Sequence, residues 1–207
     1  MKLVDLSHTI EHGMITYPGL PAPAITTWLA REESRAKYAN QAEFHIGRID
    51  MIANTGTYLD TPSHRFAEGD DTSSLALEKV AAVPAIVVDH GEAFPDVKGH
   101  AVLVRTNWSR NWGTSAYLSG HPFLTKSDVE QLASGGAVLV GIDSLNIDDT
   151  NDLSRPAHTI LLRHGIPVLE HLTNLDQLPK NGFRLFAVPP KVKGMGTFPV
   201  RAFALIP

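Results

Sequence analysis

The sequence predicts an α/β fold, and its pattern of short apolar runs is the main reason. Three such runs are bounded by proline, glycine or charge, as is typical of buried strands: residues 83–89, 100–105 and 137–143. A helix is predicted to begin at Pro156 and to stop before Gly165, with a strand following at residues 166–170. Strand, helix and strand in such close succession indicate a right-handed crossover between parallel strands. No linker divides the chain, so we expect one domain over residues 1–207.

The N-terminal part of the chain is less regularly patterned. A short strand is expected at residues 3–10, and Tyr17 precedes a Pro-Gly pair that marks a turn. Residues 21–43 predict no element, whereas residues 44–52 are expected to form a strand. That strand would lead directly into the most informative part of the sequence.

The second half of the chain carries clearer signals. A helix is predicted over residues 125–133, with Thr125 as its N-cap. Two further strands are expected at residues 183–188 and 198–206. Residues 107–120 contain two tryptophans among small polar residues and are expected to form a loop that overhangs a pocket.

Composition excludes several classes of protein and of site. No cysteine is present, so a metal would have to be held by His, Asp, Glu or water. A formal charge of −4 and an apolar fraction of 43% fit neither a nucleic-acid-binding surface nor a disordered chain. No apolar stretch approaches the roughly 18 residues of a membrane span, and the N-terminus lacks the apolar segment of a secretion signal. We therefore expect a cytoplasmic protein that acts on a small molecule, with no nucleic-acid or membrane partner.

Residues 54–65, Asn-Thr-Gly-Thr-Tyr-Leu-Asp-Thr-Pro-Ser-His-Arg, hold the densest group of reactive side chains. Their threonines and Thr-Pro pair favour an extended backbone, in which alternate side chains share a face. Four side chains would then point the same way: Asn54, Tyr58, Asp60 and His64. Asp60 and His64 can ligate a metal or act as acid and base beside one. The alternative is an edge strand whose Asp and His are simply solvated.

Further acids and a histidine are expected near one edge of the sheet. Asp143 and Glu170 end parallel strands, and open α/β sheets bind their ligands at that edge. His158, in the first turn of the connecting helix, can face the same edge. A glutamate that ends an apolar strand is costly to bury unless it is paired or metal-bound. The alternative for Glu170 is a salt bridge to one of three arginines: Arg155, Arg163 or Arg201.

These residues resemble the motif of the cyclase family of metal-dependent hydrolases, which includes kynurenine formamidase and isatin hydrolase. The family motif H-x-G-T-H-x-D-x-P-x-H corresponds here to Asn54-x-Gly56-Thr57-Tyr58-x-Asp60-x-Pro62-x-His64. The resemblance extends over nearly the whole chain, with family-like segments at Asp5-Leu6-Ser7, Tyr17-Pro18-Gly19, Gly141-Ile142-Asp143-Ser144, His158, Glu170 and Pro199-Val200-Arg201-Ala202.

The resemblance implies a compact α/β domain with a mixed sheet or barrel-like core of the swivelling β/α type, carrying crossover helices. It also implies assembly as a homodimer or homotetramer. Carried across by position, Asp60, His158 and Glu170 would be metal ligands and His64 the catalytic acid/base. Tyr17 would stand where the family has an aromatic residue that contacts substrate.

The motif departs from the family at two positions. Asn54 and Tyr58 replace two imidazole ligands, and an amide and a phenol are poor substitutes for a metal of this kind. We therefore expect one of the family's two metal positions to be lost. One divalent ion, Zn²⁺ or Mn²⁺, would remain on Asp60, His158 and Glu170. Asn54 and Tyr58 are predicted to hydrogen-bond a substrate carbonyl or the bound water instead.

The leading functional hypothesis is arylformamidase-like hydrolysis of a small amide, formamide or cyclic amide. Water activated by the metal would attack the carbonyl carbon, and His64 would relay the proton. A second hypothesis is a metal-independent lyase or isomerase, which would need Tyr58 with a lowered pKa beside His64. A third is a small-molecule binder without activity. The pocket walls are expected from residues 28–44 and from the loop between Trp108 and Trp112.

Overall fold

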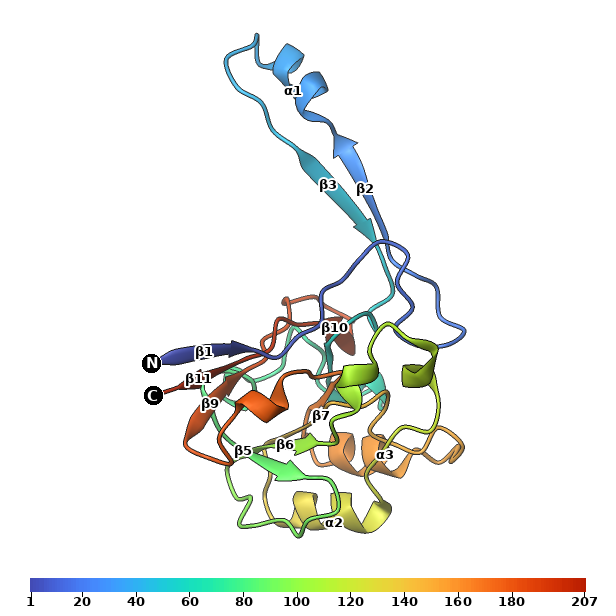
Figure 1. Ribbon diagram of the computed structural model, residues 1–207, viewed down its shortest axis with the longest axis vertical. Coiled ribbons are helices and arrows are strands. Elements are labelled where there is room, and N and C mark those ends of the chain that lie inside the picture. The colour runs from blue at the N-terminus through green and yellow to red at the C-terminus, as the bar shows by residue number, and fades with distance from the viewer.

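The computed structural model describes all 207 residues and is built on one curled, nine-stranded mixed sheet. In spatial order the strands are β1 (Lys2–Asp5), β11 (Phe203–Ile206), β9 (Phe183–Phe186), β5 (Val83–Asp89), β6 (Ala101–Arg105), β7 (Leu139–Ile142), β8 (Val168–Glu170), β4 (Tyr58–Asp60) and β10 (Thr197–Pro199). Strands β5 to β8 are mutually parallel, and every other pairing is antiparallel. The pairing of β1 with β11 brings the two termini together (Figure 1).

Two helices that the sequence predicts cover one face of the sheet. Helix α2 (Lys126–Ser134) connects β6 to β7, and α3 (Pro156–Arg163) connects β7 to β8. Thr125 caps α2, since its side chain accepts a hydrogen bond from the backbone N–H of Asp128, three residues on. The parallel pairing of β7 with β8 confirms the predicted crossover.

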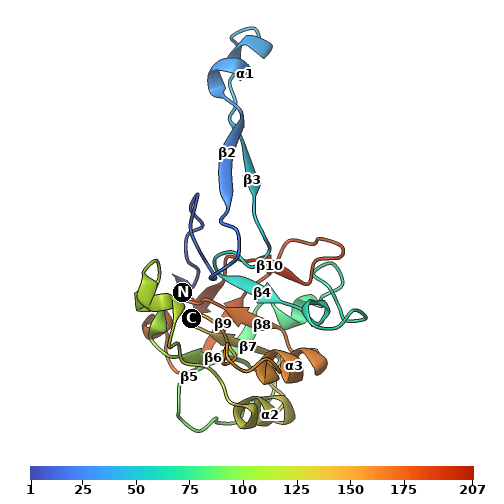
Figure 2. The ribbon, with the colours of Figure 1, turned by 90° about the vertical axis from the view of Figure 1, so that its right-hand side faces the viewer.

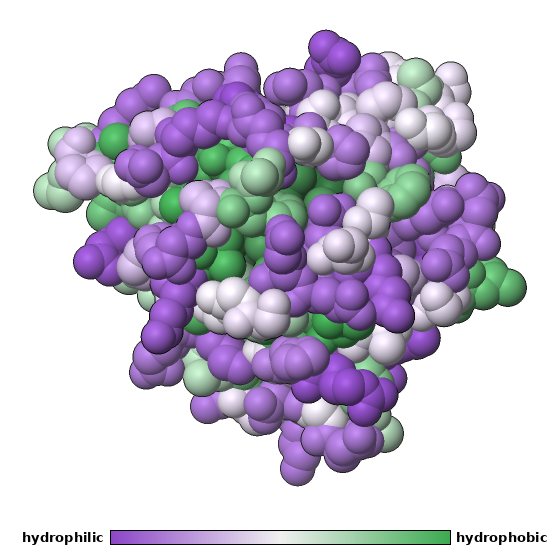
Figure 3. Space-filling model, turned by 90° about the horizontal axis from the view of Figure 1, so that it is seen from below, coloured by the Kyte–Doolittle hydropathy of each residue, from purple (hydrophilic) through white to green (hydrophobic).

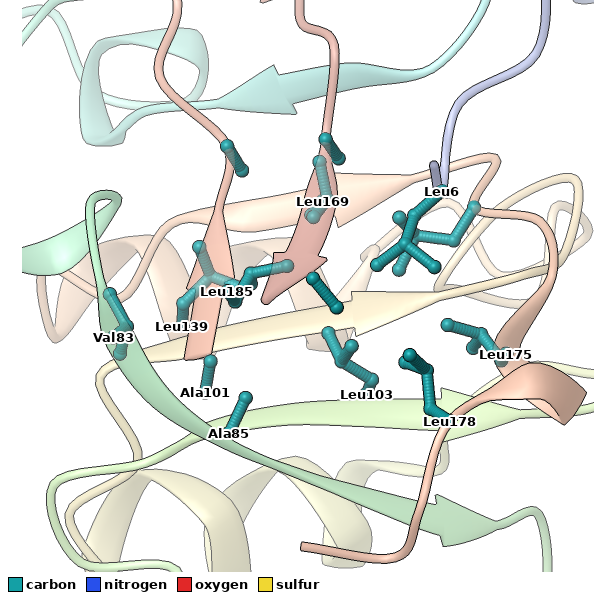
Figure 4. Packing of buried hydrophobic residues seen from close by; sticks show 14 of the residues in the cluster. Leu6, Val83, Ala85, Ala101, Leu103, Leu139, Leu169, Leu175, Leu178 and Leu185 are labelled. Carbon is teal, nitrogen blue, oxygen red and sulfur yellow. The ribbon is translucent and has the colours of Figure 1, made fainter. Parts of the chain in front are cut away.

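The sheet has an apolar core on each face. One cluster of 20 buried residues includes Leu6, Leu103, Leu169 and Leu185, whose side chains gather in a common layer (Figure 4). The other, of 17 residues, lies between the sheet and the helices α2 and α3. The clusters are of similar size, so the central strands are buried on both sides, which explains their unbroken apolar runs.

Short 3-10 turns occupy several connections: η1 (Pro62–His64), η2 (Leu77–Lys79), η3 (Trp108–Asn111), η4 (Ser115–Leu118) and η5 (Leu175–Gln177). The expectation that residues 54–65 form one extended strand is wrong, because only Tyr58–Asp60 pairs in the sheet. Gly56 adopts a left-handed backbone with φ of 66°, and Pro62 begins η1.

Residues 24–50 form an arm that projects far from the body (Figures 1 and 2). It is a two-stranded antiparallel ribbon of β2 (Ala24–Leu29) and β3 (Ile46–Asp50), with α1 (Arg31–Lys37) near its tip. The strand expected at residues 44–52 therefore exists, but it does not join the main sheet. The expectation that residues 28–44 form a pocket wall is wrong, because the arm leads away from the body.

The body surface opposite the arm is mostly hydrophilic, with hydrophobic residues visible between the polar ones (Figure 3). None of the helices has the length and apolar character needed to cross a membrane.

Candidate metal site

Strand β4 places two of the predicted residues on one face of the sheet, between β8 and β10. Tyr58 is in register with Glu170 of β8, and Asp60 is in register with Thr197 of β10. Residues directly opposite each other on antiparallel strands are close enough for their side chains to interact. Accordingly, the Tyr58 hydroxyl donates to Oε2 of Glu170 at 2.6 Å, and the Thr197 hydroxyl donates to Oδ1 of Asp60.

His64 reaches the same place through the η1 turn rather than through a strand. The loop before β10 passes close to this turn at Gly196, where an added Cβ would lie 2.5 Å from the backbone nitrogen of His64. Only glycine allows this approach. It brings the Thr197 hydroxyl to 2.7 Å from Nδ1 of His64. Thr197 therefore connects His64 to Asp60.

His158 is fixed by Asp148 at the start of α3. The Asp148 carboxylate accepts hydrogen bonds from the backbone N–H groups of Ala157 (2.6 Å) and His158 (3.1 Å), so it caps the helix from outside. Its Oδ2 atom also lies 2.6 Å from Nδ1 of His158. The second ring nitrogen, Nε2, is then left facing Asp60 at 3.4 Å and Glu170 at 3.8 Å.

Asp60, His64 and His158 form the candidate metal cluster, because one ligand atom from each lies within 4.8 Å of the others. Oδ2 of Asp60 is buried and has no hydrogen-bond partner. Such an atom is rare in a folded protein and calls for a specific partner. Glu170 borders this cluster, and both of its oxygens already accept hydrogen bonds, from Tyr58 and from the backbone N–H of Ile147 (2.7 Å).

The buried acids of the cluster favour positive charge beside them. Burial alone would raise the pKa of Asp60, but His64, His158 and the Thr197 hydroxyl together lower that pKa below its usual value. Burial alone would lower the pKa of His158, yet Glu170, Asp148 and Asp60 raise that pKa to about 10. The buried acids thus stabilise positive charge at His158.

Tyr58 and Glu170 favour their protonated forms more than usual. Burial, with the charges of Glu170 and Asp60, raises the pKa of Tyr58 well above 10. Burial likewise raises the pKa of Glu170 to about 7, against the opposing effect of His158. Tyr58 therefore acts as a hydrogen-bond donor to Glu170. The lyase hypothesis requires a lowered pKa at Tyr58, whereas this environment raises that pKa.

The cluster opens into a cavity of about 330 Å³. Ten residues line it: Tyr17, Leu20, Asn54, Tyr58, His64, Arg65, Asn146, Arg155, His158 and Glu170. Six of the seven predicted site residues are among them, and the seventh, Asp60, lies fully buried behind the wall. The loop between Trp108 and Trp112 is absent from this lining, so its predicted place in the pocket wall is wrong. Trp112 instead borders a separate cavity of about 770 Å³ beside His8.

Two other interpretations of the sequence are corrected. Asp143 does not join the site, because its carboxylate accepts hydrogen bonds from Thr106 and from the backbone N–H of Asn107. It thereby fixes the loop after β6. Glu170 forms no salt bridge to an arginine, and Arg201 pairs with Asp5 instead.

Sequence reasoning missed Asp148 and Thr197, which orient the two histidines. Asp148 precedes α3 by several residues, and an acid before a predicted helix was a usable signal for a cap. Thr197 offered no such signal, since its partners lie more than 130 positions away in the sequence. Arg65, Asn146 and Arg155 were likewise not assigned to the cavity.

The curled mixed sheet and its cluster of buried Asp60, buried His158 and exposed His64 define an α/β protein with a candidate metal site. The chain belongs to the cyclase family: the family model described as "Putative cyclase" matches residues 4–97 and 90–149. This confirms the resemblance seen in the sequence.

Comparison with individual proteins agrees with this assignment. The chain is 29% identical to a kynurenine formamidase of Salinibacter ruber, over 98% of this chain and 96% of that protein. It is 28% identical to the kynurenine formamidase of Paracidovorax citrulli, over 99% of this chain and 97% of that protein. Among solved structures, isatin hydrolase A from Ralstonia solanacearum has a TM-score of 0.82 at 24% identity, covering 100% of this chain and 92% of that one. The similarity to the isatin hydrolase structure confirms the predicted α/β fold class.

Proposed function

We propose that this protein is a metal-dependent hydrolase that cleaves the C–N bond of a small amide, formamide or cyclic amide. One observation carries the proposal: the unpartnered Oδ2 of buried Asp60 lies 3.4 Å from Nε2 of His158, at the wall of a cavity. The relatives named kynurenine formamidase and the similar structures of isatin hydrolases support this reaction class.

The residues present suit one divalent cation, zinc or manganese. Asp60 offers a free oxygen, and His158 offers a nitrogen whose ring is fixed by a carboxylate, a common arrangement around protein-bound metals. The third ligand in this proposal is Glu170, as the family resemblance implies, and His64, which lies beside the same atoms, serves as the acid/base. Tyr58 supports a single ion, because its neutral phenol occupies the space beside Glu170 where the family has an imidazole.

When bound, such an ion supplies Lewis acidity toward the substrate carbonyl and lowers the pKa of a water molecule. His64 is the residue that moves the proton. Its Nδ1 is hydrogen-bonded to the Thr197 hydroxyl, which in turn donates to Asp60, so Nε2 remains available. The His64 side chain is 36% exposed and lines the cavity, so it can accept a proton from water and pass it to the leaving nitrogen. Tyr17 and Asn54 line the same cavity and are proposed to bind substrate.

We also propose that the protein assembles with a second copy of itself, as a homodimer or homotetramer. The arm carries large apolar side chains that are exposed in the single chain: Ile25, Trp28, Tyr38, Phe44, Ile46 and Ile49. An isolated two-stranded ribbon is at best marginally stable in water, and its apolar residues need a surface to pack against. The arm's own body supplies none, since the ribbon extends away from it (Figure 2).

The decisive experiment measures metal per chain and turnover together. Protein purified without a metal-affinity tag is equilibrated with Zn²⁺ or Mn²⁺, and its metal content is determined by elemental analysis. About one ion per chain, lost in Asp60→Ala but kept in the surface control Asp96→Ala, supports the proposal. His64→Ala should lower formamide turnover by about a hundredfold or more while the ion stays bound. Absence of bound metal under both conditions would overturn the mechanism.

A further inference from the structure

Two arginines line the candidate cavity without a carboxylate partner. Arg65 donates only to the backbone carbonyl of Ser154, at 3.4 Å, and Arg155 only to that of Asp149, also at 3.4 Å. Neither guanidinium lies within 4.0 Å of an acidic oxygen. Both contacts are long, so most of the ten N–H donors of the two groups remain free.

Three other arginines of this protein form salt bridges with nearby acids. Arg35 pairs with Glu43, Arg105 with Asp89 and Arg201 with Asp5. The chain carries a formal charge of −4, so acids are not scarce. Arg65 and Arg155 share the lack of an acidic partner with other arginines, such as Arg184, and differ from Arg184 in lining the candidate cavity.

The cavity itself offers them no anion. Glu170 is its only acidic lining residue, and both Glu170 oxygens already accept hydrogen bonds from Tyr58 and Ile147. Asp60 lies behind the wall, fully buried. No residue of the cavity lining therefore neutralises the guanidinium charges of Arg65 and Arg155, and these charges are available to a molecule that enters.

Both arginines are held close to the proposed reaction centre. Arg65 directly follows His64 in the sequence, and Arg155 lies three positions before His158. The hydrogen bond from Arg65 to Ser154 joins the two segments. Arg155 also adopts a left-handed backbone, with φ of 47°, at the N-cap of α3, an uncommon conformation for a residue with a side chain.

We propose that Arg65 and Arg155 bind a carboxylate of the substrate, so that the protein acts on amides that carry a negative charge near the scissile bond. This inference rests on the proposed function and specifies its substrate class. A planar guanidinium matches a carboxylate with two parallel hydrogen bonds, which orients the bound molecule as well as attracting it. Held at this wall, the carboxylate turns the amide group toward His64 and Asp60.

The test compares substrates that differ only in charge. Formanilide, its three ring-carboxylated isomers and their methyl esters are offered to the metal-loaded protein, and formate release gives kcat and KM. We expect at least one carboxylated isomer to have a KM about tenfold or more below that of its methyl ester, because hydrogen bonds to charged groups are the stronger ones. This preference should decline as ionic strength rises.

Single substitutions then assign the preference to the two arginines. Arg65→Gln and Arg155→Gln should each raise the KM of the preferred carboxylate about tenfold or more and raise that of its ester much less. Arg65→Lys and Arg155→Lys should restore part of the loss, since charge returns without the planar fork. Arg184→Gln is the matched control, because Arg184 also donates to a backbone carbonyl, that of Ala82, but lies outside the cavity. Thermal unfolding confirms that each variant is folded.

The possible failures are distinguishable. Equal turnover of carboxylates and esters, or a carboxylate preference that survives both glutamine variants, would overturn the arginine assignment and leave the hydrolase proposal intact. If none of the compounds is hydrolysed, calorimetric titration of benzoate and benzamide still decides the matter. Benzoate should bind more tightly than benzamide, and the glutamine variants should abolish the difference. Benzoate affinity that is unchanged in both variants would contradict the assignment whatever the reaction.

Discussion

Oδ2 of Asp148 lies 2.6 Å from Nδ1 of His158, and both side chains are buried. This single contact fixes the plane of the imidazole ring and directs Nε2 toward Asp60. The same carboxylate caps helix α3 through the backbone of Ala157 and His158. Asp148 therefore both caps the helix and orients the proposed ligand His158, although it is not itself a proposed ligand.

Asp148→Asn should weaken metal binding by about 10- to 100-fold with a modest loss of stability. Asparagine still caps a helix, but its neutral amide holds the imidazole less strongly than a carboxylate does. Competition with a chelator of known affinity measures the effect. Asp152→Asn, in the exposed loop just before α3, is the control and should bind metal as the wild type does. Equal affinities in the two variants would show that Asp148 serves the helix alone.

Thr197→Val should lower kcat by about tenfold or more while leaving the fold intact, because valine keeps the shape of threonine and removes the hydroxyl that joins His64 to Asp60. Thr197→Ser retains the hydroxyl and should recover most of the activity. Separate values of kcat and KM provide the second measurement, since loss of the Thr197 contact should lower kcat more than it raises KM. A Thr197→Val enzyme with the wild-type kcat would exclude this relay.

The proposed ligands and the acid/base could be predicted from the sequence, whereas the two residues that orient the histidines could not. Asp60, His64, His158 and Glu170 could be found because they follow a motif or end a recognisable element. Asp148 and Thr197 reach the histidines only through tertiary contacts, and the register of β4 against β10 is what brings Thr197 to Asp60. Nothing in a single sequence specifies the register of two strands so far apart along the chain.

Tyr58→Phe should destabilise the protein by about 1–3 kcal/mol, because it leaves one oxygen of buried Glu170 without its donor. Turnover should fall by less than about tenfold if Tyr58 supports Glu170 and takes no part in proton transfer. Urea unfolding and steady-state kinetics give the two values. Activity that resists a chelator in the wild type and disappears in Tyr58→Phe would instead favour the lyase hypothesis.

Stability should decrease as the pH falls from about 6.5 toward 4, with His8 as one cause. The His8 ring stacks on Trp112 with centroids 4.0 Å apart, and burial lowers the pKa of His8 to about 4. An unfolded chain protonates His8 near pH 6.5, so over this interval the unfolded state binds more protons and folding is disfavoured. Burial also lowers the pKa of His171, to about 3, and acts in the same direction.

His8→Phe isolates the His8 contribution, because phenylalanine can stack on Trp112 without titrating. The variant should lose about 1–3 kcal/mol less stability than the wild type between pH 7 and pH 4. Chemical denaturation at a series of pH values gives the comparison. Identical pH dependence in both proteins would remove His8 from the explanation. The dependence that remains in the variant would belong to His171 and to other groups.

The body of the fold was more predictable than the arm. Strands β5, β6 and β7 are buried on both faces, so their apolar runs are unambiguous, and Thr125 and Pro156 mark where α2 and α3 begin. Strand β3 lies within the strand expected at residues 44–52, but the sequence predicts neither β2 nor its pairing with β3, because both strands contain mostly exposed residues and pair only with each other. The apolar side chains of the arm do not pack on the core of the body. The arm sequence therefore lacks the alternation of buried and exposed residues by which a strand is recognised.

Substitution of Trp28 by glutamate should dissociate the proposed assembly of two or more copies. The Trp28 side chain is 68% exposed in the single chain and lies on β2 of the arm. Burying a large apolar side chain contributes about 1.5–3 kcal/mol, so a buried charge in its place should weaken association by tenfold or more. Leu153→Glu is the control, because Leu153 is 87% exposed on the body. Analytical ultracentrifugation across a range of protein concentrations measures the effect. A wild-type protein that remains monomeric throughout, or a Trp28→Glu variant that associates as the wild type does, would exclude the arm as the contact between copies.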